Sequence, residues 1–411
     1  MSAIPKTMRA VVYRGVNDLR LETVPVPRIG AHELLVKVAV CGVCPTDIKK
    51  IQHGTVPPPR IFGHETAGTI VRIGGGASVL ASRFKIGDRV ALHHHVPCLD
   101  CHFCRHRAFA QCETYKRTGI TAGFEPAGGG YAEYVRVMPF VLPGVVKIPA
   151  KNSFEEGAML EPVNTVLKAV RRLNLLRGDA VLVAGQGPIG LMFTRLLQLQ
   201  GACVLATDLL ASRLRLAKKF GAKWTCLGRD GWPSRPRTPR RGVPTSTLAS
   251  QLPTLNLQLD TAIIAVPSDA VVHQALQLVR GGGQVLLFAH TKRSEFGRDG
   301  SPSRPRTPRR GVTTSSLSAA GGGEDRGAVA TPNFQLDLAS ICLDEKDLIG
   351  SYSSDFTLQD EVARLVFSRQ LDVRRLITHR FPLEQTAVAV QLAARPTPDS
   401  LKILVTQLYP Q

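Results

Sequence analysis

The stretch from Ala180 to Asp208, AVLVAGQGPIGLMFTRLLQLQGACVLATD, decides the fold of this 411-residue chain. It begins with a short apolar run typical of a buried strand and passes through G-x-G-x-x-G into an apolar helical run at residues 189–202. A second apolar run then ends at Asp208. Strand, glycine turn, helix and strand in this order predict a βαβ unit, so we expect an α/β domain with a parallel sheet.

The glycines of this turn have separate tasks. The first, Gly185, makes the tight turn after the strand, and Gly190 lets the helix pack closely on that strand. Gly187 lets the backbone approach a pyrophosphate, which the helix start at Pro188 and Ile189 would face with its N–H groups. The turn therefore predicts a dinucleotide-binding site.

Asp208 follows Gly185 by 23 residues, at the end of the next predicted strand. A carboxylate at this place can accept hydrogen bonds from the ribose 2′-OH of NAD. The 2′-phosphate of NADP would face a like charge, which costs roughly 3 kcal/mol at 5 Å and an effective dielectric constant of 20. The predicted cofactor is therefore NAD rather than NADP, although Arg213 is placed to soften that preference.

Four cysteines form the sharpest motif of the chain, C-x2-C-x2-C-x7-C. They are Cys98, Cys101, Cys104 and Cys112. Closely spaced thiolates on a turning loop supply the four soft donors of a tetrahedral zinc. With four protein ligands this site is predicted to be closed and structural. The alternatives are an iron–sulfur site or four reduced thiols.

A second set of metal donors comes from three separate segments. One follows a predicted strand at Leu34–Val40, one follows a proline-rich loop, and one begins a predicted helix at 159–170. Cysteine, histidine and carboxylate ligands are the set that holds a catalytic zinc with an open position. The candidate ligands are Cys44, His64, Glu65 and Glu161, and Thr46 lies beside them, two residues after Cys44.

Part of the net charge of +20 comes from a 23-residue unit that occurs twice, at Gly228–Ser250 and Gly297–Ala319. Each copy carries +4 and consists largely of Pro, Arg, Ser and Thr. Such a composition buries too little apolar surface to fold, so both copies are predicted to be disordered inserts in surface loops. Nucleic-acid binding by the arginines is the functional alternative. Because Trp232 is the one aromatic residue in the two copies, we do not expect a nucleic-acid partner.

The cysteine count is nine, and residues 1–10 contain no apolar signal core. An odd number of cysteines without a signal peptide argues against a disulfide framework and for a reducing compartment. No apolar run reaches the roughly 18 residues that span a bilayer. The sequence thus predicts a cytoplasmic protein without a membrane partner.

With these motifs in place, the chain resembles the zinc-dependent medium-chain dehydrogenase/reductase family of the alcohol dehydrogenase superfamily, in its sorbitol and threonine dehydrogenase branch. The resemblance covers nearly the whole chain outside the two repeats. It rests on CGVCPTD (41–47), FGHETAG (62–68), GDRV (87–90), the four-cysteine segment, GGGYAEYV (128–135), LEPVNT (160–165), GQGPIG (185–190), LIGSYSSD (348–355) and LITHRFPLEQ (376–385).

The resemblance implies a doubly wound parallel Rossmann sheet and a GroES-like, β-rich catalytic domain. Residues 1–155 would form the N-terminal part of the catalytic domain, with the structural zinc lobe at 93–115. Residues 156–352 would form the NAD-binding domain, with the repeats as inserts at 228–250 and 297–319. Residues 353–411 would return to the catalytic domain.

The resemblance also assigns roles at the predicted catalytic zinc. Cys44 and His64 would be two ligands, and either Glu65 or Glu161 the third protein contact; the sequence does not choose between them. The adjacent Cys41 is interpreted as packing.

Thr46 would accept the hydroxyl proton of the substrate. Related dehydrogenases often carry histidine where this chain has Lys49, so the proton would leave through Thr46 and the ribose hydroxyls, or with the help of His53, which is more simply a surface residue. At most one residue of His93–His95 is expected to face the cleft.

The implied activity is transfer of a hydride between NAD and the CH–OH group of a secondary alcohol, polyol or amino-alcohol, with two zinc ions per chain. A homodimer or homotetramer is expected by the same resemblance. The alternatives are a non-catalytic NAD-binding relative and a protein that binds nucleic acid through its arginine-rich repeats. No motif identifies the substrate.

Overall fold

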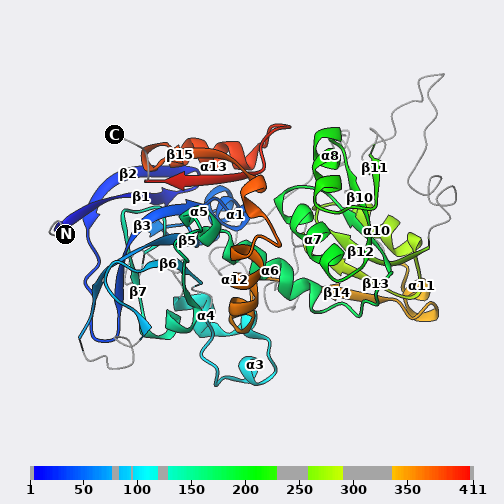
Figure 1. Cartoon of the computed structure of the whole chain (residues 1–411), viewed down its shortest axis with the longest axis horizontal. Helices are drawn as coiled ribbons and strands as arrows, with labels where there is room; N and C mark the ends of the chain where they lie inside the picture. Colours follow the sequence, from blue (N-terminus) through cyan, green and yellow to red (C-terminus); the bar gives the residue numbers. More distant parts are fainter. Residues whose placement is uncertain are drawn as a thin grey trace, which may run out of the picture.

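The computed structural model describes residues 4–75, 83–93, 96–118, 128–228, 258–289 and 336–407. Their strands form a six-stranded, a seven-stranded and a three-stranded sheet. Figure 1 shows the six-stranded sheet in one half of the molecule and the other two sheets in the opposite half. Both repeats of the 23-residue unit lie outside the described residues, apart from Gly228.

The six-stranded sheet is parallel throughout, in the order β11-β10-β9-β12-β13-β14. Its strands are β9 (Ala180–Ala184), β10 (Cys203–Asp208), β11 (Trp224–Leu227), β12 (Leu259–Ile264), β13 (Val279–Leu287) and β14 (Asp347–Gly350). The helices of this half are α7 (Pro188–Leu199), α8 (Ala211–Lys219), α10 (Asp269–Leu278) and α11 (Leu338–Leu343). All five residues of β9 are buried, as a central parallel strand requires.

The seven-stranded sheet joins distant parts of the chain, in the order β15-β16-β3-β5-β6-β8, with β7 paired to β3. Its strands are β3 (Leu34–Gly42), β5 (Glu65–Ile73), β6 (Arg89–Leu92), β7 (Tyr134–Val137), β8 (Val145–Lys147), β15 (Ile377–Pro382) and β16 (Lys402–Thr406). The small sheet contains β1 (Thr7–Gly15), β2 (Asp18–Pro25) and β4 (Arg60–Ile61). Two strands near the C-terminus therefore complete a sheet that begins near the N-terminus.

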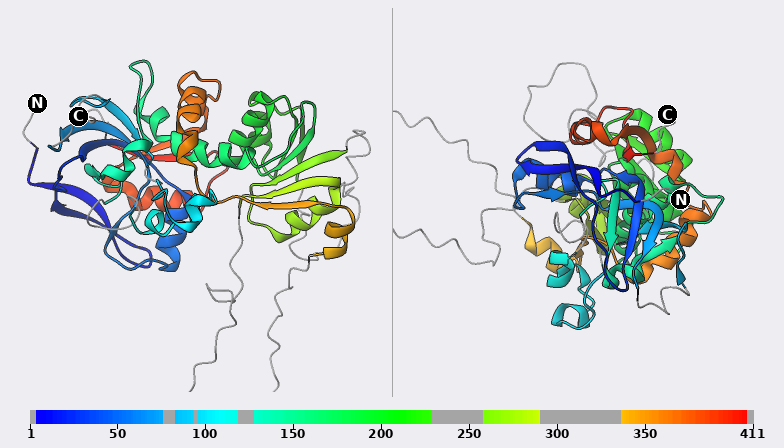
Figure 2. Two further views of the ribbon diagram at one scale, coloured as in Figure 1. Left: turned by 90° about the horizontal axis from the view of Figure 1, so that it is seen from below. Right: turned by 90° about the vertical axis from the view of Figure 1, so that its left-hand side faces the viewer.

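Short helices surround this second half. They are α1 (Pro45–His53), α3 (His102–Arg105), α4 (Glu113–Thr118), α5 (Phe154–Ala158) and α13 (Thr386–Ala394). Two more, α6 (Leu160–Val170) and α12 (Gln359–Phe367), lie between the two halves (Figures 1 and 2). Among the described residues, no helix is long and apolar enough to cross a membrane.

One hydrophobic core runs through both halves by way of α6. It combines Val163 and Leu167 of this helix with Ala67 of the seven-stranded sheet and Val181 of the parallel sheet. Because an apolar core is close-packed, the two sheets are held in a defined relation, and groups on α6 can contact both.

The predicted βαβ unit is confirmed, with small shifts at its ends. The helix predicted at 189–202 begins at Pro188 and ends at Leu199, before Gly201 at φ +89°. In the other half, the strand predicted at Leu34–Val40 continues to Gly42, which pairs with Glu65, the first residue of β5. Pairing with a neighbouring strand sets the end of β3, and the sequence of a single strand does not show that pairing.

Candidate active site and metal centres

One edge of the seven-stranded sheet gathers four strand ends. β3 pairs with β5 through Gly42 and Glu65, and with β16 through Gly42 and Leu404. β5 pairs with β6 through Thr66 and Leu92. Since all these pairs are antiparallel, the ends of β3 and β6 and the beginnings of β5 and β16 share this edge. The residues that the chain places there are Cys44, His64, Glu65, His93 and Lys402.

Helix α1 begins at the same edge and positions two of these side chains. Cys44 is its N-cap, and the Cys44 Sγ accepts a hydrogen bond from the Thr46 N–H at 3.4 Å. Asp47, in the first turn, is fully buried and its Oδ1 lies 3.1 Å from His64 Nδ1. The carboxylate thereby orients the imidazole, as carboxylates behind metal-binding histidines do.

Cys44, His64 and Glu65 bring their ligand atoms within 4.8 Å of one another. Burial opposes protonation of His64, but the carboxylate of Asp47 and the Cys44 sulfur outweigh it and raise the pKa of His64 well above its ordinary value. The structure groups Glu65, and not Glu161, with the other two donors. A thiolate, an imidazole and a carboxylate at this separation suit one zinc ion, so the donor set fits the predicted metal.

Lys402 adds a buried cation to this centre. Its Nζ forms an ion pair with Glu65 and donates a hydrogen bond of 3.0 Å to the carbonyl of Val43. Burial lowers the pKa of Lys402, but Glu65, Cys44 and Glu161 together raise it above its ordinary value. The ion pair with Lys402 thus compensates the charge of Glu65 inside the protein.

The four cysteines of the predicted structural site also converge. The Sγ atoms of all four lie within 4.8 Å of one another, and none forms a disulfide. The backbone N–H groups of Asp100 and Cys101 lower the pKa of Cys98 to about 6, whereas burial raises the pKa of Cys104 to about 12. This donor set fits a closed tetrahedral zinc.

The glycine turn after β9 has the predicted geometry. Gly185 has φ +92°, which favours glycine, and a Cβ on Gly190 would lie 1.7 Å from the Gly185 carbonyl oxygen. Around Gly187 nothing lies within 4 Å of a Cβ position, and α7 begins at the next residue. The open space before a helix N-terminus fits a pyrophosphate.

Asp208 lies at the end of β10, against this turn. Its Oδ2 accepts the N–H of Gln186 at 2.7 Å and its Oδ1 accepts that of Leu210 at 2.9 Å. Arg213 Nη1 lies 3.9 Å from Asp208 Oδ2, and Arg213 Nη2 donates to the carbonyl of Ser400 at 3.4 Å. Each carboxylate oxygen keeps a further lone pair, so Asp208 can still accept a ribose hydroxyl.

The other residues considered in the sequence analysis differ in their burial. Cys41 is fully buried next to the Thr66 hydroxyl and is outside the donor group, in keeping with a packing role. Lys49 and His53 are exposed on α1. His93 is fully buried, whereas residues 94 and 95 lie outside the described residues.

Sequence reasoning missed the roles of Asp47 and Lys402. Asp47 lies inside the CGVCPTD motif, three residues after Cys44, where the first turn of a helix turns it inward. The sequence around Lys402 shows one unusual feature, a charged residue at the start of an apolar run (LKILV). Its hydrogen-bond partner Val43, however, is 359 residues earlier in the chain, so the sequence does not reveal the contact.

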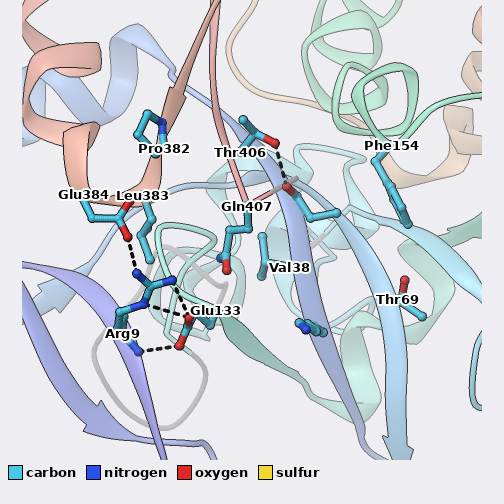
Figure 3. A pocket seen from close by; sticks show the side chains of 12 residues that line it. Arg9, Val38, Thr69, Glu133, Phe154, Pro382, Leu383, Glu384, Thr406 and Gln407 are labelled. Carbon is cyan, nitrogen blue, oxygen red and sulfur yellow. Dashed lines mark hydrogen bonds and ion pairs between the residues drawn. The ribbon is translucent and has the colours of Figure 1, made fainter. Parts of the chain in front are cut away.

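A cavity of about 510 Å³ lies elsewhere on the seven-stranded sheet (Figure 3). Its walls include Val38 and Thr69, and no residue of the donor groups lines it. Arg9 in this cavity is bound to Glu133 and Glu384, so the charges compensate one another. The cavity is therefore not part of the candidate active site.

Comparisons with known proteins agree with this geometry. A family model, the alcohol dehydrogenase GroES-like domain, matches residues 30–150. Sorbitol dehydrogenase of Bombyx mori is 27% identical over 402 residues, covering 96% of this chain and 97% of that protein. D-xylulose reductase A of Aspergillus oryzae is 32% identical over 233 residues, covering 54% of this chain and 62% of that protein.

Two solved structures have the same fold. An alcohol dehydrogenase from Escherichia coli, in complex with NADH, matches 98% of this chain and 100% of its own, with a TM-score of 0.74 and 22% identity. A zinc-binding dehydrogenase from Sinorhizobium meliloti, bound to NADP, also matches 98% of this chain and 100% of its own. Its TM-score is 0.73 and its sequence identity is 24%.

Proposed function

Because the chain belongs to the zinc-dependent medium-chain dehydrogenase/reductase family, in its sorbitol dehydrogenase-like branch, we propose that it transfers a hydride between NAD and the CH–OH group of a polyol or other secondary alcohol. The observation that carries this proposal is the convergence of Cys44, His64 and Glu65 at one sheet edge. We assign these three residues to the catalytic zinc, and Glu161 to the wall of the same site.

Bound zinc supplies Lewis acidity, which lowers the pKa of an alcohol hydroxyl. Around it, Asp47 accepts a hydrogen bond from His64 Nδ1 and so leaves the other ring nitrogen for the metal. The hydroxyl of Thr46, in the first turn of α1, would accept the substrate proton and pass its own on through the ribose hydroxyls to water. Lys49 lies one turn further along this helix and is exposed.

The dinucleotide is assigned to the turn at Gly185, Gly187 and Gly190, with Pro188 and Ile189 at the helix start. Asp208 would accept the ribose 2′-OH, and Arg213 would flank it. NAD rather than NADP is supported by the carboxylate at this position, which would repel a 2′-phosphate.

Replacing Asp208 with asparagine tests the cofactor assignment. We expect the ratio of kcat/KM for NAD to kcat/KM for NADP to fall on the order of 100-fold, because the repulsion of the 2′-phosphate is removed. The matched control is Asp260→Asn. Asp260 lies on the same sheet, and its carboxylate also accepts a backbone N–H, that of Ala180. An unchanged ratio in Asp208→Asn would exclude this residue as the determinant.

The four-cysteine site at Cys98, Cys101, Cys104 and Cys112 is assigned to a second, structural zinc. We also propose the division of the chain into a catalytic domain at 1–155 and 353–411 and an NAD-binding domain at 156–352. The pairing of β16 with β3 supports the C-terminal return.

The decisive experiment combines a substrate panel with metal analysis. The purified chain is mixed with NAD and polyols, simple secondary alcohols or amino-alcohols, and NADH formation is followed by absorbance. Zinc is quantified on the same sample. We expect NADH formation with at least one secondary alcohol and two zinc ions per chain. No NADH with any alcohol, or a single zinc, would favour a non-catalytic relative.

A homodimer is proposed on the surface at β14. This strand ends the parallel sheet among the described strands, and α11 beside it contains no buried residue. Leu338 and Leu343 of α11 are 69% and 82% exposed, an apolar surface that a second copy would cover. Light scattering should give twice the chain mass for the wild type and a monomer for Leu343→Asp. A monomeric wild type would refute the pairing.

We place the enzyme in the cytoplasm, which the nine free cysteines support. The arginine-rich repeats are assigned no role in the reaction. Neither the relatives nor the described residues lend support to nucleic-acid binding.

A further inference from the structure

A pair of histidines lies in the four-cysteine segment, and neither of the two proposed zinc sites uses it. Helix α3 begins with His102, and His106 is the residue that caps its C-terminus. The His106 N–H donates to the carbonyl of His102 at 3.3 Å, which is the hydrogen bond of one α-helical turn. The two residues are therefore spaced i and i+4, and lie one above the other on the same face of the turn.

The two imidazole rings lie next to each other. Their centroids are 4.5 Å apart, and the ring planes form an angle of 60°. Both residues are exposed, and no described residue forms a hydrogen bond or ion pair with either ring. Histidines at i and i+4 on a helix are a known arrangement for holding one metal ion between two ring nitrogens. The geometry of this pair is therefore that of a two-imidazole chelate.

The histidine pair is separate from the four-cysteine site. At about 100° per residue, Cys101 and Cys104 are centred about 150° around the helical turn from the two histidines. Burial shows the same division, since Cys104 is 5% exposed whereas both histidines are exposed. The four Sγ atoms also form a donor group of their own, which contains neither histidine. An ion between the imidazoles would thus be distinct from the proposed structural zinc.

The surroundings of the pair allow a cation to approach from solvent. Figure 1 shows α3 in a loop that projects from the body of the molecule. The neighbouring cation, Arg105, forms an ion pair of 3.3 Å with Asp100, which offsets its charge. Both members of this ion pair are exposed, so salt screens what repulsion is left.

We propose that His102 and His106 form a third metal site, which takes a divalent transition-metal ion such as Zn²⁺, Ni²⁺ or Cu²⁺. Imidazole suits these ions, whereas Mg²⁺ and Ca²⁺ prefer oxygen ligands. Two protein ligands leave the other coordination positions to water, so the ion exchanges with solvent. Because α3 has four residues, too few for an isolated helix to be stable, an ion that bridges its turn stabilises the turn that carries Cys104.

Binding of Ni²⁺ to the purified chain, with its own zinc in place, tests this site. Isothermal titration calorimetry counts the nickel ions and gives their dissociation constants. In His102→Gln and in His106→Gln, the dissociation constant of one Ni²⁺ should rise about 100-fold, because a chelate loses the effective concentration of its second donor. The variant with both changes should bind this ion no more weakly than either single variant. Nickel bound by other histidines is common to all these proteins.

Two controls separate chelation from the mere number of histidines. His106→Gln combined with Arg107→His keeps that number but moves one imidazole to i+5, off the shared face, so it should bind as weakly as His106→Gln. Arg107 has φ +55°, a conformation that histidine adopts more readily than most residues. His273→Gln changes an exposed histidine on α10 and should bind nickel like the wild type.

Thermal unfolding checks that a bound ion stabilises the protein. Added Ni²⁺ should raise the unfolding temperature of the wild type and of His273→Gln more than that of His102→Gln or His106→Gln, since a ligand of the folded state stabilises it. Zinc is quantified in every protein and should equal the wild-type content. None of these measurements depends on dehydrogenase activity.

Three results would overturn the inference. One is the same nickel binding in the wild type and in the variant that lacks both histidines. Another is a loss that adds up, with each single variant losing half as much as the double variant, which indicates two independent weak ligands. The third is loss of a zinc ion together with the nickel, which would make the histidines part of the four-cysteine site.

Discussion

Replacing Cys44 with serine will lower kcat for NAD-linked alcohol oxidation at least about 10³-fold, because Lewis-acid activation contributes several kcal/mol to the rate. The zinc content should fall from two ions per chain to one. The fold should be retained: Cys44 is the N-cap of α1 and accepts the N–H of Thr46, a task that serine performs well. Steady-state kinetics and zinc analysis on the same preparation measure both effects.

Cys203→Ser is the matched control for this variant. Cys203 is a partly exposed free thiol at the start of β10, outside both groups of metal donors. It should keep two zinc ions and wild-type turnover. If Cys44→Ser also turned over at the wild-type rate with two zinc ions, Cys44 would not be a ligand of the catalytic metal.

The second large effect is expected from Lys402→Met in protein freed of metal. Glu65 is 1% exposed, and its ion pair with Lys402 is buried. Removing one partner of a buried pair leaves an uncompensated charge, which costs about 3–5 kcal/mol of stability. Zinc at the donor group would itself compensate Glu65, so added zinc should restore much more stability to Lys402→Met than to the wild type.

Denaturant unfolding with a chelator and with zinc measures this difference. Lys346→Met is the control, because Lys346 is also buried, at 9% exposure, but donates to the carbonyl of Leu276 in the parallel half. Its loss of stability should not depend on zinc. An equal zinc response in both variants would mean that Lys402 is not coupled to the metal centre.

Several features of this protein were predictable because the residues that form them lie close together in the sequence. The turn at Gly185 and Gly190 and the four-cysteine motif each lie within a few residues, and local geometry alone brings their groups together.

Which of Glu65 and Glu161 lies with Cys44 and His64 was not predictable from the sequence. Both are carboxylates next to an apolar segment, and the sequence treats them alike. Sheet register separates them: Glu65 is paired with Gly42, two residues before Cys44, whereas Glu161 lies on α6. Register depends on pairing between strands that are distant in the chain, so no local pattern contains it.

By itself, then, the sequence determined the βαβ unit and its glycine turn, supplied two sets of candidate metal donors, and pointed to the family. Only the tertiary structure decided which donors meet and that Lys402 balances Glu65. The physical reason is that backbone preferences act over a few residues. Contacts between residues hundreds of positions apart arise only when the strands pair and their apolar faces are buried together.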